Sequence, residues 1–214
     1  LLIVDPKYDS DKLPTSLSAE LCQYGQTYLK CPYDNTYFLL NEYEEKTLQA
    51  KIREIVNIIS DLGATYIKHE TKLKTLKQRD IDEKFNGSIP AGELDIAIKK
   101  SESEFQNSFF SNIWENEHVD VDVAGYALAV ERATRCGLDK DLVVSTLLNS
   151  RNPQKPIRTK SFNQKTTIST EVNEALDVAC SLNALKGYVN IDNTFLKTTR
   201  FKREIETTFE VRFD

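Results

Sequence analysis

The feature that most constrains the fold is a near-strict alternation of side chains near the end of the chain. Between residues 201 and 213, odd positions are mostly apolar and even positions are charged or carry a hydroxyl group. Successive side chains of a β-strand point to opposite faces, so the pattern predicts one long strand with a buried face and a wet face. Such strands are typical of antiparallel sheets. The residues expected on the buried face are Phe201, Arg203, Ile205, Thr207, Phe209, Val211 and Phe213.

Helical periodicity predicts three further regions. Residues 42–62 carry apolar side chains at three- and four-residue spacing, and Gly63 is expected to end that helix in a left-handed conformation. Residues 122–150 indicate a helical hairpin, with Asp139 as the N-cap of its second helix. The apolar residues expected to line the first helix of this hairpin are Ala124, Ala127, Leu128 and Val130. A last helix is expected from an N-cap at Thr170 to Gly187.

Extended segments are expected at residues 64–67, 94–98 and 157–168, whereas residues 1–41 show no regular pattern. Together these elements predict an α+β fold: a long-stranded antiparallel sheet with helices on one face and an inserted helical hairpin. The 214 residues fit a single domain, with a weak candidate boundary at the proline-containing segment 151–156.

Positive charge is segregated along the chain, although the net charge is −5. Segments 64–79, 151–165 and 197–203 hold 14 of the 28 basic residues and only one acid, Glu70. If folding brings these segments together, they form a basic surface that attracts an anionic partner, such as a nucleic acid or an acidic membrane surface. If it does not, each segment is an ordinary solvated face. The candidate anion-binding residues are Lys68, Lys72, Lys74, Lys77, Arg79, Arg158, Lys160, Lys197, Arg200, Lys202 and Arg203.

Catalytic signatures are missing from the sequence, which holds no glycine-rich phosphate loop, nucleophile elbow or paired C-x-x-C motif. We therefore expect no cofactor. One acidic cluster could bind a hard cation through its carboxylates, as a candidate metal site. The simpler interpretation is that these acids precede a helix and interact favourably with its dipole. Its residues are Glu115, Glu117, His118 and Asp120.

These patterns favour a non-enzymatic binding or effector module that engages a protein, a second copy of itself or an anionic partner. Two alternatives stay open: a membrane-active protein that uses long amphipathic strands, and a metal-dependent phosphodiester hydrolase that uses the acidic cluster. Four cysteines without metal-binding spacing indicate reduced thiols and a cytoplasmic protein, and no segment is apolar enough to span a membrane. The first residue is not methionine, which indicates that the natural start is missing.

Overall fold

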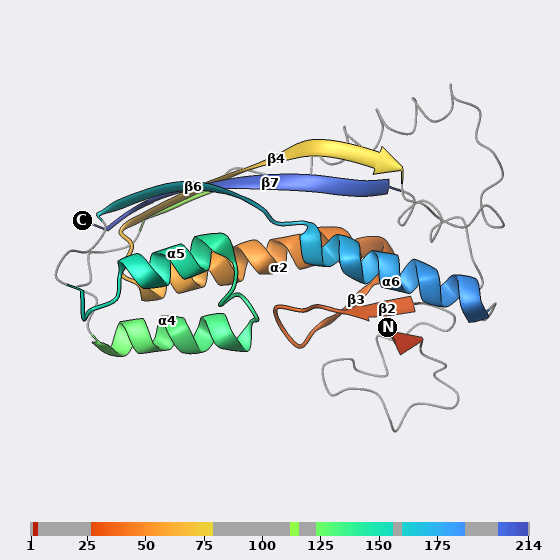
Figure 1. The fold of residues 1–214 in the computed structure, drawn as a ribbon, viewed down its shortest axis with the longest axis horizontal. Coiled ribbons are helices and arrows are strands. Elements are labelled where there is room, and N and C mark those ends of the chain that lie inside the picture. Colours follow the sequence, from red (N-terminus) through yellow and green to blue (C-terminus); the bar gives the residue numbers. More distant parts are fainter. Residues whose placement is uncertain are drawn as a thin grey trace.

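The computed structural model describes residues 2–3, 27–78, 112–115, 123–155, 160–186 and 201–213. Its elements form layers, with an antiparallel sheet on one side, three helices beneath it, and a fourth helix and a small sheet beneath those (Figure 1). The three central helices are α2 (Leu40–Asp61), α5 (Leu142–Ser150) and α6 (Thr170–Lys186). The lowest layer holds α4 (Val123–Arg135) and the strands β1 (Leu2–Ile3), β2 (Thr27–Lys30) and β3 (Tyr37–Leu39). The predicted α+β class is confirmed.

The main sheet has the strand order β5-β4-β7-β6, and every neighbouring pair is antiparallel. Its two central strands are long and run side by side over their whole length, with one irregularity in the pairing between Leu73 and Thr75. The edge strands are shorter and cover only part of their neighbours. The bounds are β5 (Asn112–Glu115), β4 (Tyr66–Gln78), β7 (Phe201–Arg212) and β6 (Ser161–Thr167).

Strand β7 confirms the prediction made from alternation. Ile205, Thr207, Phe209 and Val211 are completely buried against the helices, whereas the side chains between them reach solvent. The antiparallel pairing to β4 and β6 places the same alternation on all three strands. One face of the sheet therefore belongs to the core, and the opposite face is polar.

The start of α6 closes the edge of β7 where β6 ends. Ser169 Oγ accepts a hydrogen bond from the backbone N–H of Ile205 at 2.9 Å, and Asn173 Nδ2 donates to the carbonyl oxygen of Arg203 at 2.6 Å. These bonds satisfy backbone groups that would otherwise lack a strand partner. The helix begins at Thr170 itself, so the prediction of Thr170 as the N-cap is wrong by one residue.

Helix α2 is the centre of the core, and its predicted apolar stripe is confirmed. Leu48, Ile55, Ile59 and Leu62 are completely buried. Gly63 adopts a φ of 78°, and its N–H bonds to the carbonyl of Ser60, which ends the helix as expected.

The inserted hairpin is also confirmed, with two corrections. Asp141, not Asp139, caps α5, because its carboxylate accepts the backbone N–H of Val143 at 3.0 Å. None of the four apolar residues expected to line α4 is buried, since Ala124 and Ala127 are exposed, Leu128 is 47% exposed and Val130 is 37% exposed. The buried face of α4 consists instead of Ala129 and Ala133, since small side chains allow α4 to approach α2 closely.

Several predictions fall on other parts of the chain. Residues 94–98 and Gly187 lie outside the described residues, and the irregular reading of residues 1–41 is wrong where β2 and β3 form. The single-domain assignment stays a prediction, although one buried cluster includes residues from both sides of segment 151–156. Within the described ranges, no helix is both long enough and apolar enough to cross a membrane.

Candidate binding surface

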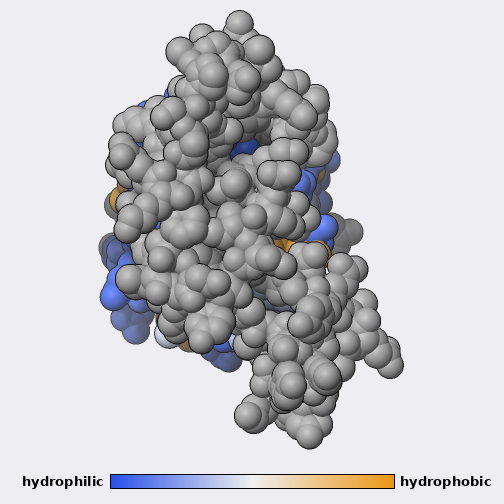
Figure 2. All heavy atoms as spheres, turned by 90° about the vertical axis from the view of Figure 1, so that its right-hand side faces the viewer, coloured by the Kyte–Doolittle hydropathy of each residue, from blue (hydrophilic) through white to orange (hydrophobic). Residues whose placement is uncertain are grey.

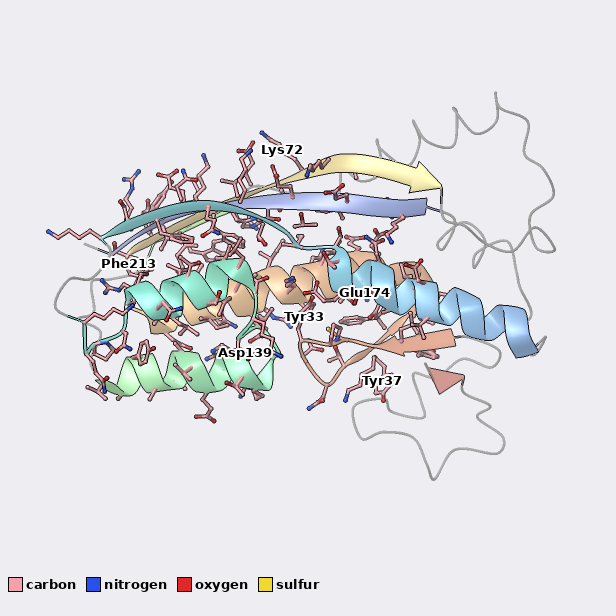
Figure 3. The ribbon with its side chains drawn as sticks, viewed as in Figure 1. Tyr33, Tyr37, Lys72, Asp139, Glu174 and Phe213 are labelled. Carbon is pink, nitrogen blue, oxygen red and sulfur yellow. The ribbon has the colours of Figure 1, made fainter. Side chains whose placement is uncertain are left out.

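The face of the main sheet that points away from the helices is the strongest candidate for a functional surface. We call it the outer face, and none of the described helices or strands covers it (Figure 1). Lys72 points from it into solvent (Figure 3), with 69% of its side chain exposed. The charged side chains of the outer face include Lys68, Glu70, Lys72 and Lys74 on β4, Glu204, Glu206, Glu210 and Arg212 on β7, Lys165 on β6 and Glu115 on β5.

Folding brings parts of all three basic segments to this sheet. Strand β4 lies in the first segment, whereas β6 begins in the second and β7 begins in the third. Because β7 lies between the other two strands, the three segments are neighbours in space. Strand spacing of about 4.8 Å keeps their side chains within reach of one another.

The glutamates of β7 lie among these bases. Lys68 is opposite Glu210, and Lys72 is opposite Glu206. Ion pairs form across the strands: Lys74 Nζ lies 3.1 Å from Glu204 Oε1, and Lys165 Nζ lies 3.2 Å from Glu206 Oε1. The outer face is thus a surface of interleaved charges rather than a continuous basic patch.

Other candidate anion-binding residues have different positions. Lys202 lies 3.3 Å from Asp177 of α6, and Arg203 points inward to form an ion pair with Glu44. Lys160 is exposed next to β6, and the backbone of Lys77 pairs with that of Lys202. Four residues lie outside the described part of the chain: Arg79, Arg158, Lys197 and Arg200. Anion binding stays a prediction.

Figure 2 shows the side of the molecule where β4 ends and β7 begins. In the end-on view of Figure 2, the described residues that reach the surface are mainly hydrophilic, with small hydrophobic patches between them. Of the acidic cluster considered as a metal site, only Glu115 is described, on the exposed strand β5. No group of metal-binding side chains occurs among the described residues.

A buried lysine connects three helices beneath the sheet. Lys51 of α2 is only 1% exposed, and its Nζ lies 3.0 Å from Glu171 Oε1 and 3.2 Å from Asp141 Oδ2. Those two carboxylates belong to the first turn of α6 and to the N-cap of α5. The ring of Tyr33 covers the ammonium group, with its centroid 5.6 Å from Nζ. Burial and the nearby Glu171 carboxylate raise the pKa of the Tyr33 hydroxyl.

Sequence reasoning missed this lysine, although a signal was present. Lys51 is three residues from Leu48 and four from Ile55, so it occupies an apolar position of the α2 stripe. A charged residue at such a position requires a buried partner. Because the ammonium group of Lys51 pairs with carboxylates at the ends of two helices, we assign Lys51 a structural role.

A cavity of about 580 Å³ lies between the β2–β3 turn, α2 and the end of α4. Its lining includes the free thiols of Cys31 and Cys136 together with Asp34 and Glu54. Burial raises the pKa of Cys31 to about 11, and burial together with Glu54 raises the pKa of Cys136. Both thiols are therefore protonated near neutral pH, which makes them weak nucleophiles. The carboxylates already pair with Arg53 and Arg132.

His69 of β4 lies on the buried face of the main sheet, opposite Phe209 of β7. It is 4% exposed, and its ring stacks on Trp114 of β5 with centroids 5.2 Å apart. Its Nδ1 lies 3.4 Å from the hydroxyl of Thr71. Burial lowers the pKa of His69, because the charged form loses its hydration.

This lowered pKa predicts a pH-dependent stability. The unfolded chain binds a proton at His69 more readily than the native chain, so the free energy of unfolding falls as the pH drops below about 6.5. We expect the contribution of His69 to reach at most about 1.4 kcal/mol per pH unit. Urea unfolding of the native protein and of His69→Phe between pH 7.5 and 5.5 measures it. If the free energies of unfolding of the two proteins change equally with pH, His69 has the same pKa in the folded and the unfolded chain, which would contradict the prediction.

Comparisons with known proteins do not assign the chain to a family. No protein-family model matches it, and no curated protein or solved structure is significantly similar.

Proposed function

We propose that this chain is a non-enzymatic binding module that uses the outer face to bind a protein. The observation that carries the proposal is the outer face itself, a polar sheet surface of interleaved lysines and glutamates that no described helix covers. Charged surfaces of this kind guide partners by electrostatic complementarity and reject partners whose charges do not match.

The position of the acids favours a protein over a polyanion. A nucleic acid or an acidic membrane gains affinity when bases neutralise its phosphates and release counterions. On the outer face, Glu206 and Glu210 of the central strand lie beside the lysines of β4 and would repel phosphates. A protein surface can present both signs of charge at matching positions, so it fits the outer face better.

The partner class can be tested with a displayed peptide library. Selection uses the native chain, and counter-selection uses a variant that lacks four charges at the centre of the outer face: Lys72→Thr, Lys74→Ser, Glu204→Gln and Glu206→Gln. We expect enriched peptides that carry both acidic and basic residues, bind the native chain more tightly at low salt, and lose affinity for the variant.

Two results would contradict the proposal. One is a set of enriched peptides that bind the native and variant chains equally. The other is salt-dependent binding of the native chain to duplex DNA or to phosphatidylserine vesicles that exceeds its binding to any selected peptide. Either result would move the functional surface elsewhere or change its partner class.

A further inference from the structure

We infer that the partner that fits the outer face is a second copy of this chain, an inference that rests on the proposed function. The pairing of β4 and β7 places opposite charges side by side. Lys68 and Lys72 on β4 stand opposite Glu210 and Glu206 on β7, and Lys74 pairs with Glu204. The outer face therefore carries a β4 column that is mainly lysine, interrupted by Glu70, beside a β7 column that is mainly glutamate and ends at Arg212.

A two-fold axis makes these columns complementary to themselves. When the axis runs along the strands, midway between β4 and β7, it places β4 of one copy over β7 of the other. Rotation about this axis does not shift positions along it, so opposite residues in one sheet become facing residues between two sheets. Lys72 then faces Glu206 of the partner subunit, and Glu206 faces Lys72 of the partner subunit. An interface of this type repeats every contact twice.

Glu70 already forms an ion pair within its own chain, because its Oε1 lies 3.0 Å from Lys72 Nζ. Its cross-strand neighbour is Thr208, so the same axis sets Glu70 against a hydroxyl group of the other copy rather than against a carboxylate. Packed sheets lie about 10 Å apart, and extended lysine and glutamate side chains can meet across that distance. Because both sheets are twisted, the closest contacts form between β4 and β7, the strands next to the two-fold axis.

The physical chemistry predicts a salt-sensitive dimer. Exposed ion pairs are screened within about 10 Å at 0.1 M salt, so the association weakens as the salt concentration rises. Sedimentation equilibrium should show a dimer at low salt and a monomer at high salt. The side chains that face each other from β4 and β7 are mostly polar, and Ile113 of β5, which lies on the same face as Lys68 and is 57% exposed, adds an apolar contribution.

Charge exchange tests the two-fold arrangement directly. We expect Lys72→Glu and Glu206→Lys each to weaken self-association by about tenfold or more, because each creates like-charge contacts at two places. An equal mixture of the two variants should recover association, since every facing pair in the mixed dimer is again opposite in charge. The double variant, with both changes in one chain, should also dimerise. Lys46→Glu on α2 has the same net charge as Lys72→Glu and should behave as the native chain.

The outcomes separate this inference from the proposed function. Circular dichroism first verifies that each variant is folded. A native chain that stays monomeric at low salt, or single variants that dimerise like the native chain, would overturn the self-association. If selected peptides still bind the outer face in that case, the proposed function stands with another protein as the partner. If they do not bind it either, both proposals are contradicted.

Discussion

Replacing Phe209 with alanine is expected to lower the free energy of unfolding by about 3–5 kcal/mol, the largest effect of any single change considered. Phe209 is completely buried on the inner face of β7. Its ring centroid lies 6.2 Å from that of His69. Removing the ring loses apolar burial and leaves a cavity between the sheet and the helices.

Thr208 provides the matched control for Phe209. It is the next residue on β7 but lies on the outer face, so Thr208→Ala should change stability by less than about 0.5 kcal/mol. Urea unfolding monitored by circular dichroism compares the two variants with the native chain. Equal effects of the two substitutions would contradict the assignment of inner and outer faces.

Replacing Lys51 with methionine is expected to lower the free energy of unfolding by about 2–4 kcal/mol, because two carboxylates lose their shared cation. The side chain of Asp141 is 6% exposed, so its charge depends strongly on Lys51. The side chain of Glu171 is 43% exposed and can take up water, which places the effect below that of a fully buried pair.

A second substitution distinguishes lost charge from lost packing at Lys51. Adding Glu171→Gln to Lys51→Met removes one uncompensated carboxylate and should recover part of the stability. The control is Lys46→Met, because Lys46 forms an exposed pair with Glu42 within α2, and such pairs contribute about 0.3–0.5 kcal/mol. A Lys51→Met variant as stable as the control would show that the buried network does not hold the helices together.

The local patterns of the sequence predicted the elements well. The alternation around Phe209 and the helical stripe around Ile55 each reflect one face in contact with the core, and periodicity reports that directly. Gly63 was predictable because a left-handed residue after a helix favours glycine. The exact N-cap was less predictable, since Asp139 and Asp141 are chemically alike and only the fold selects Asp141 to meet Lys51.

Spatial adjacency was the part that the sequence could not supply. Lys51 contacts Glu171, which is 120 residues away along the chain. The basic segments were identified by composition, but their interleaving with Glu206 and Glu210 depends on the pairing of β7 with β4. The alternating pattern predicts that charged side chains lie on the solvent-exposed face of a strand, but it does not predict which of them become neighbours across the sheet. The apolar residues Leu128 and Val130 of α4 show the same limit, because they are exposed. An apolar pattern predicts a buried face but does not predict which element packs against it.

The central claim is that the chain binds through the outer face, and competitive lysine acetylation followed by mass spectrometry tests it most directly. Labelling rates are compared with and without a bound partner, which is either excess unlabelled chain at low salt or a selected peptide. The account predicts slower acetylation of Lys72, Lys74 and Lys165, which have exposed side chains on the outer face, and unchanged acetylation of Lys46 on α2. Equal labelling of the outer-face lysines in both states, or protection of Lys46 instead, would contradict it.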